Sequence, residues 1–249
     1  MEIQLTEPVP KVKGTASTFK AADFIPAYTE AVEKFLRDNA SLGENWQRDV
    51  AKKLYNFQGK NKEGDVLGSS PYMGVAIATF LSEISLIGGK QLLELYEQAG
   101  KKNPFGSVYI DFGVNLNGGT EINKNQAEAL LDSFIKYGIN MNEGRVPDFA
   151  QLRLVADQKS GLVFKLAEGV QDKDVANVSD YPFGSYVGKH GLFSACLDRS
   201  GRWYAYGDVL VGSDGDGRVV RYDAEGVAPK KIKETDLVSN LKQDFVRKF

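Results

Sequence analysis

The most continuously apolar stretch of the chain is Pro71–Ile87, PYMGVAIATFLSEISLI. Helix punctuation stands at both ends, since Pro71 suits the first helical position and the glycine pair after Ile87 can end a helix. A helix that is apolar on all sides must be buried on all sides, so this stretch predicts a central helix on which the other elements pack. A membrane span is the alternative, but a span needs roughly 20 apolar residues, and this run is shorter and contains Glu83.

Amphipathic helices are predicted on both sides of this run. Residues 18–38 carry apolar positions at helical spacing, residues 43–57 carry Trp, Val and Leu four positions apart, and residues 90–99 form a further predicted helix. Residues 1–16 contain Pro8 and Pro10, which disfavour a helix. We expect an extended arm there, which is either loose or paired with a sheet edge of this or another subunit.

A strand, a glycine-containing loop and a helix follow at 107–138. SVYIDFGVNL at 107–116 alternates and is rich in β-formers, and Asn123 can cap a helix that runs to Gly138. Helix N-termini attract anions, but the loop NLNGGTEIN matches neither GxGxxG nor GxxxxGK[ST] and carries Glu121. An ordinary tight turn is therefore the preferred interpretation.

From residue 149 onward the pattern is typical of β-structure. Alternating segments flank short turns rich in Asp, Ser and Gly, which predicts a meander of about six short strands. The predicted hairpins lie at 151–167, 192–206 and 208–222.

Two further segments complete this part of the chain. Residues 168–191 form a long irregular segment, which is either functional or contains elements that the pattern hides. Leu237, Leu241 and Phe245 are spaced as in an amphipathic C-terminal helix.

These elements predict an α+β fold with three parts. Residues 1–16 form the arm, residues 17–148 are mainly helical with one strand–loop–helix unit, and residues 149–249 are mainly antiparallel β with the C-terminal helix. We expect the two larger parts to share one interface, and they can form one compact domain.

Composition narrows the classes of function. The chain has 31 basic and 33 acidic residues, which argues against a wholly basic nucleic-acid-binding surface. With Cys196 as the single cysteine and His190 as the single histidine, neither an internal disulfide nor a Cys/His zinc site can form within one chain. The first residues lack the basic start and apolar segment of a signal peptide. We therefore expect a soluble protein in the cytoplasm or another intracellular reducing compartment, with no membrane partner.

Motifs for catalysis are weak. Gly184–His190, GSYVGKH, has the wrong spacing for a phosphate loop, and GSDGDGR at 212–218 departs from a calcium loop at the sixth position. A Cys196–His190 pair is disfavoured because alternation places Cys196 in an apolar strand. Carboxylate pairs such as Asp172 with Asp174 are not singled out by the pattern. We predict no catalytic residue, no metal ligand and no cofactor.

Aromatic and basic residues alternate in two predicted strands, RWYAY at 202–206 and RVVRY at 218–222. If these strands are neighbours and their tyrosines face outward, they form a stacking platform for single-stranded nucleic acid or sugars. Ordinary cross-strand packing is the favoured alternative. The candidate ligand-binding residues are Arg202, Tyr204, Tyr206, Arg218, Tyr222, Tyr186, Lys189 and His190.

Three hypotheses of function follow. The leading one is a non-catalytic interaction or assembly protein that acts through its surface on a protein partner or by self-association. The second is a binding module for nucleic acid or carbohydrate that uses the aromatic and basic face. The third is a hydrolase with a carboxylate-based site near 168–191.

Overall fold

The computed structural model describes residues 15–19, 24–57, 71–81, 85–117, 134, 137, 139, 144–183, 191–206 and 218–223. All structural statements below concern these residues. Within them the chain forms four α-helices, which are α1 (Ile25–Asp38), α2 (Glu44–Asn56), α3 (Pro71–Phe80) and α4 (Gly89–Gln98).

The described strands are β1 (Thr15–Phe19), β2 (Ile110–Asn117), β3 (Arg145–Val146), β4 (Leu152–Asp157), β5 (Gly161–Leu166), β6 (Ala176–Asn177), β7 (Gly191–Leu197), β8 (Trp203–Tyr206) and β9 (Val219–Asp223). Short 3-10 turns are η2 (Ala40–Leu42), η3 (Phe149–Gln151), η4 (Asp172–Asp174) and η5 (Val178–Asp180). The chain thus has the predicted α+β composition.

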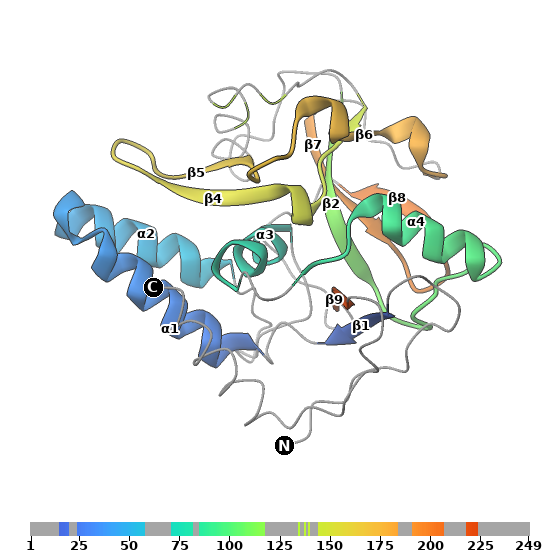
Figure 1. The fold of residues 1–249 in the computed structure, drawn as a ribbon, viewed down its shortest axis with the longest axis horizontal. Helices are drawn as coiled ribbons and strands as arrows, with labels where there is room; N and C mark the ends of the chain where they lie inside the picture. Colours follow the sequence, from blue (N-terminus) through green and yellow to red (C-terminus); the bar gives the residue numbers. More distant parts are fainter. Residues whose placement is uncertain are drawn as a thin grey trace.

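The strands form one larger sheet and two strand pairs. The larger sheet has the order β6-β3-β2-β7-β8, and its neighbours are antiparallel. β4 pairs with β5 as a hairpin, and β1 pairs with β9. Figure 1 shows β2 running through the middle of the molecule, with α3 on one side of it and α4 on the other.

Two apolar clusters fill the two sides of this sheet. The first core joins α1, α2, α3 and the β4–β5 hairpin to Val114, Leu116 and Leu192 of the sheet. The second core joins Leu92 and Leu95 of α4 to residues of β2, β7 and β8. Along β7, alternation directs Leu192 to the first core and Ala195 and Leu197 to the second. Along β2, the change from the second core to the first follows the register shift between Asp111 and Gly113.

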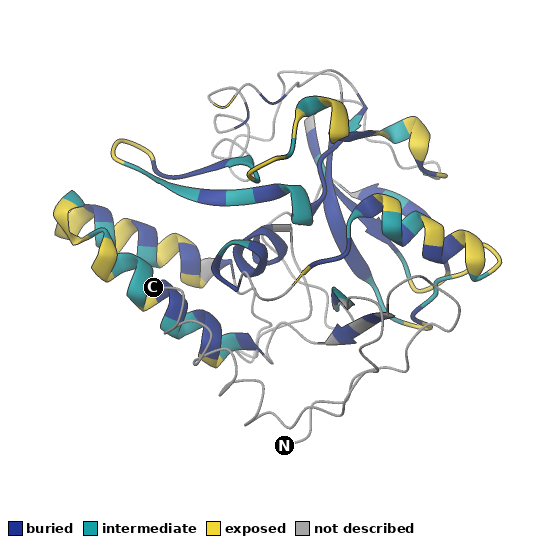
Figure 2. Cartoon of the chain, viewed as in Figure 1, coloured by how far each residue is buried: buried dark blue, intermediate teal, exposed yellow. Residues whose placement is uncertain are grey.

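Helix α3 is nearly enclosed. Its residues from Tyr72 to Phe80 are buried except for the half-buried Thr79, and Figure 2 shows α3 dark while the outward faces of α1, α2 and α4 are yellow. The predicted helix over residues 71–87 is too long, because α3 ends at Phe80.

The apolar residues that follow α3 join a strand instead. Leu86 bridges Arg221 of β9, Ile87 donates its N–H to the carbonyl oxygen of Val220, and Ile87 packs in the second core. A short apolar run does not distinguish helix from extended chain. The residue before α4 is Gly88, so this glycine serves at the start of α4.

The predicted start of the first helix is also wrong. Residues 18–38 were expected to be helical, but Thr15–Phe19 forms β1, and α1 begins at Ile25 with Pro26 in its first turn. Pro26 fits the start of a helix because its missing N–H is not needed there. Helices α2 and α4 confirm the predictions for 43–57 and 90–99, and the strand predicted at 107–116 is observed as β2, Ile110–Asn117.

The predicted meander is replaced by a less local arrangement. The β4–β5 and β7–β8 hairpins are confirmed, but they belong to different sheets, and β9 pairs with β1. The strand β2, which precedes residue 149, lies between β3 and β7. Residues 168–183 contain η4, β6 and η5.

Several predicted features lie outside the described residues. They are the arm up to residue 14, most of the 123–138 helix, the 208–211 strand, the 212–217 turn and the C-terminal helix.

The β4–β5 hairpin is fixed to the first core where η3 crosses α3. A Cβ atom on Gly74 would lie 2.2 Å from the ring of Phe149, so the glycine allows this ring to lie directly on the helix. The N–H of Leu154 then donates to the hydroxyl of Thr79 at 2.8 Å.

We predict that Gly74→Ala lowers the free energy of unfolding by about 1 kcal/mol. The added methyl group overpacks against Phe149, and this cost exceeds the gain of about 1 kcal/mol that alanine normally brings to a helix. Urea denaturation measures the change. In a Phe149→Leu background, where the ring is absent, Gly74→Ala is expected to cost less. An equal cost in both backgrounds would contradict the contact.

Candidate functional site

Of the residues predicted to bind a ligand, Arg202 and Tyr204 lie together on one face of the β7–β8 hairpin. Trp203 and Ala205 are buried in the opposite direction, as the alternation predicts. The guanidinium carbon of Arg202 stands 5.0 Å from the centroid of the Tyr204 ring, which is the distance of a cation–π contact. The side chain of Tyr206 lies outside the described part of the structure.

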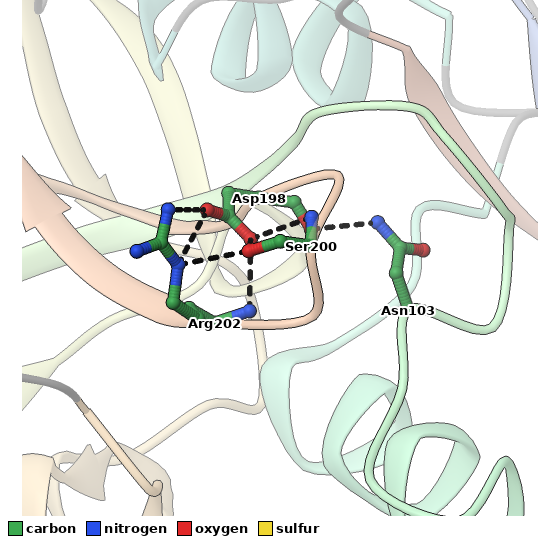
Figure 3. Close-up of polar contacts among 4 residues, drawn as sticks. All are labelled: Asn103, Asp198, Ser200 and Arg202. Atoms are coloured by element: carbon green, nitrogen blue, oxygen red, sulfur yellow. Dashed lines mark hydrogen bonds and ion pairs between the residues drawn. The ribbon is translucent and has the colours of Figure 1, made fainter.

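Arg202 is also part of the turn that joins β7 to β8 (Figure 3). One carboxylate oxygen of Asp198 accepts hydrogen bonds from the N–H groups of Ser200 and Arg202, both at 2.8 Å, and from the Ser200 hydroxyl. The other oxygen accepts from the Arg202 guanidinium, whose nearest nitrogen lies at 3.0 Å. Arg202 is therefore held by the turn.

The same turn is tied to the loop after α4. The Asn103 amide donates to the carbonyl oxygen of Asp198 at 2.9 Å and to that of Val108 at 2.7 Å. Burial raises the pKa of the Asp198 carboxyl, but the hydrogen bonds from Arg202 and Ser200 outweigh burial and lower the pKa below its usual value. These hydrogen bonds stabilise the turn, so a structural role accounts for its polar residues.

Arg218 and Tyr222 do not join this face. β8 belongs to the five-stranded sheet and β9 pairs with β1, so the two strands are not neighbours in one sheet and the condition for a shared platform is not met. Val220 is buried in the second core, and Tyr222, two positions further along β9, packs against the same core. Tyr222 therefore packs inward, and of the candidate side chains that the structure describes, the Arg202–Tyr204 pair remains on the outer face.

Tyr186, Lys189 and His190 lie outside the described residues. The potential partner of His190, Cys196, is fully buried on β7. Burial raises the pKa of the Cys196 thiol, and the nearby charge of Asp111 adds to the effect. Thiolate chemistry is therefore disfavoured at this position.

A surface groove that the sequence did not reveal lies between α2 and the turn of the β4–β5 hairpin. It has a volume of about 570 Å³. We call it the α2–hairpin groove; its lining residues are Trp46, Asp49, Val50, Lys52, Lys53, Gln158, Lys159, Ser160 and Gly161. In Figure 1 the hairpin extends over α2, which brings these two distant segments together.

Two long-range hydrogen bonds fix the walls of the groove. The indole N–H of Trp46 donates to the carbonyl oxygen of Asp157 at 2.9 Å, and the Lys53 ammonium donates to the carbonyl oxygen of Ser160 at 3.2 Å. Gly161 has a φ of +80°, and a Cβ atom there would lie 3.1 Å from Val50. The hairpin thus approaches the helix closely at a position that favours glycine.

The groove carries more positive than negative charge. Its lining contains Lys52, Lys53 and Lys159 against Asp49, and the Asp49 carboxylate lies 3.8 Å from the guanidinium of Arg48. Lys52 and Lys159 form no hydrogen bond or ion pair through their side chains among the described residues. The groove can therefore attract anionic groups.

A second polar group that sequence analysis missed is the buried carboxylate of Asp148, which is 7% exposed. One of its oxygens accepts from the N–H of Gly89, the first residue of α4, at 2.9 Å, and the other accepts from the N–H of Gln151 at 3.0 Å. Burial raises the pKa of the carboxyl to about 6, and these hydrogen bonds together with Arg153 oppose the rise only in part. The hydroxyl of Tyr181 is also buried and has no hydrogen-bond partner in the described part of the chain.

Two acidic residues of the irregular segment, Asp174 and Asp180, serve as caps. Asp174 accepts from the N–H of Gln171, and Asp180 accepts from the N–H of Asn177, each at 2.8 Å. Among the residues that the structure describes, no group of three or more His, Cys, Asp and Glu side chains is placed to hold a metal ion. No described helix is long and apolar enough to cross a bilayer.

Comparisons of this chain with protein-family models, with curated proteins and with solved structures find no match.

We predict that Asp148 makes the stability of the protein depend on pH. The folded chain holds the Asp148 proton more tightly than the unfolded chain, in which aspartate titrates near ~3.9. Its contribution to stability is therefore complete below about pH 4 and is lost as the pH rises through about 6. Urea denaturation of the wild type and Asp148→Asn measures this effect. The wild-type advantage is expected to be larger at about pH 4.5 than at about pH 7.5, and an unchanged difference would contradict it.

We also predict that Asp198→Ala lowers the free energy of unfolding by about 1–2 kcal/mol, because the turn loses its acceptor for two N–H groups. Asp198→Asn keeps one acceptor oxygen and is expected to cost less. Since the pKa of Asp198 is lowered on folding, the stabilisation by the carboxylate is present above about pH 4 and declines as the pH falls through the lowered value. Thermal unfolding across this pH range is the measurement; a variant as stable as the wild type would rule the network out as a stabilising element.

Proposed function

We propose that this protein is a non-catalytic binding protein and that the α2–hairpin groove holds part of its partner. The observation that carries the proposal is the groove itself, with a volume of about 570 Å³ and a lining from two segments about a hundred residues apart in sequence. Such concave sites with a few polar groups are typical of ligand recognition.

The walls of the groove are already fixed in the absence of a partner, which supports a role in binding. Trp46 and Val50 are buried beneath the hairpin, and the hydrogen bonds from Trp46 and Lys53 hold the hairpin turn against α2. A wall that is already in place loses little conformational freedom when a partner binds, which favours affinity.

The chemistry of the lining also supports binding rather than catalysis. Lys52, Lys53, Gln158, Lys159 and Ser160 are all exposed. Ammonium, amide and hydroxyl groups at exposed positions can recognise a partner, whereas general acids, bases and nucleophiles usually depend on desolvation or a charged neighbour to adjust their pKa.

The other two hypotheses receive less support. Nucleic-acid or sugar binding would rest on the Arg202–Tyr204 pair, but Asp198 engages the guanidinium of Arg202. A hydrolase would need free carboxylates near 168–191, and Asp174 and Asp180 act there as turn caps.

Some finer expectations remain proposals alongside this function. They are the role of α3 as the helix around which the chain is organised, the C-terminal amphipathic helix, the arm as a self-association element, and an intracellular location.

We predict that Gln158→Trp blocks binding by filling the groove from an exposed position. Peptides selected for binding to the whole protein from a displayed random library provide the probes, and their affinities are measured by fluorescence anisotropy. Selected peptides are expected to bind Gln158→Trp about tenfold more weakly or worse, a loss of about 1.4 kcal/mol.

The matched control is Gln98→Trp, which places the same ring on an exposed position of α4. The control is expected to bind the peptides as the wild type does. Equal binding by Gln158→Trp and the wild type would remove the groove as the binding site.

A further inference from the structure

We infer that the α2–hairpin groove recognises an acidic polypeptide segment of a partner protein, an inference that rests on the proposed function. Three of the lining side chains are lysines, Lys52 and Lys53 from α2 and Lys159 from the hairpin turn. They stand on both walls, so a segment lying in the groove passes between positive charges from either side. Such charge complementarity selects a partner and speeds its association.

The negative charge in the lining is already partly neutralised. Asp49 is flanked by Arg48, with 3.8 Å between the guanidinium and the carboxylate. The ammonium of Lys53 donates to a carbonyl oxygen at the rim, while those of Lys52 and Lys159 form no hydrogen bond or ion pair with the described residues. Two ammonium groups are thus directly available to carboxylates of a partner.

The donors in the groove suit carboxylates on a polypeptide better than phosphates. A phosphate site commonly uses a cradle of free backbone N–H groups or the fork of an arginine. Here the N–H groups of Lys159 and Ser160 already donate to the side chain of Asp157, at 3.0 and 2.7 Å. The charged groups that line the groove apart from Asp49 are lysines, which act as separate point charges.

The aromatic residue of the groove does not favour nucleic acid either. Single-stranded nucleic acids stack their bases on exposed aromatic rings. Trp46 is only 8% exposed, it packs against Phe35, and its N–H is bound to Asp157. With Val50 and Gly161 it provides a mostly apolar floor, against which the methylene groups of glutamate side chains can pack.

The test measures binding of a short fluorescent peptide of alternating glutamate and glycine to the whole protein. The variant Lys52→Gln/Lys53→Gln/Lys159→Gln removes the three charges and keeps side chains of similar length. The control Lys90→Gln/Lys102→Gln/Lys173→Gln makes the same change in charge at exposed lysines elsewhere. Unfolding curves verify that both variants are folded.

The groove variant is expected to bind the peptide about tenfold more weakly than the wild type, a size that the loss of two exposed ion pairs and of the nearby charge of Lys53 can produce. The control is expected to retain most of the affinity, and binding by the wild type is expected to weaken as salt rises to about 0.15 M.

Three outcomes would overturn the inference. They are an equal loss in both variants, no binding of the peptide to the wild type, and tighter binding of a single-stranded DNA of matched charge that is lost in the groove variant. A further outcome separates this inference from the proposed function. If library-selected peptides without net charge bind the wild type but bind Gln158→Trp more weakly, the proposed function stands and only the acidic partner is rejected.

Discussion

Through its carboxylate and its backbone, the buried residue Asp148 connects its own segment to two parts of the chain that are distant in sequence, the start of α4 and β2. It binds the N–H of Gly89 at the start of α4 and the N–H of Gln151 in η3, while the backbone of Asp148 bridges Gly113 of β2. A Cβ atom on Gly113 would lie 2.7 Å from the carbonyl oxygen of Pro147, so this approach requires a residue without a side chain. Since β4 begins at Leu152, Asp148 determines where the β4–β5 hairpin leaves the sheet.

The α2–hairpin groove forms because the β4–β5 hairpin leaves the sheet at this point and in this direction. Phe149 lies on Gly74 of α3, Leu154 binds Thr79 of the same helix, and the hairpin then extends until its turn meets α2. The Trp46 and Lys53 hydrogen bonds secure only the tip of the hairpin. Its base is fixed by core packing and a buried carboxylate, so the geometry of an exposed binding site depends on interactions in the interior.

Much of the local structure was predictable because it depends on neighbouring residues. Trp46, Val50 and Leu54 form the buried stripe of α2, and turn residues such as Asp157 and Gly161 close the hairpins. The start of α1 was missed, because the predicted helix over residues 18–38 followed the apolar spacing and did not use the proline at position 26, which lies in the first turn of α1. Long-range pairing left no such local signal. Ile87 beside β9, β1 beside β9, and β2 between β3 and β7 result from tertiary packing.

The candidate site was less predictable than the fold. Arg202 and Tyr204 were identified from their alternation, but that pattern could not show that Tyr222 packs inward or that Asp198 holds Arg202. The groove combines residues of α2 and of the hairpin turn, and Asp157 and Trp46 are 111 positions apart. Lysines are common at exposed helical and turn positions, so the sequence does not single these out. That the lysines of α2 and of the hairpin turn line one groove becomes visible only in the tertiary structure.

The most direct test of this account is the NMR spectrum of the isotope-labelled protein during titration with the acidic peptide. The account predicts that the largest amide chemical-shift changes occur in α2 and in the turn at residues 157–161. Changes concentrated on the Arg202–Tyr206 hairpin, with α2 and the turn unaffected, would contradict it.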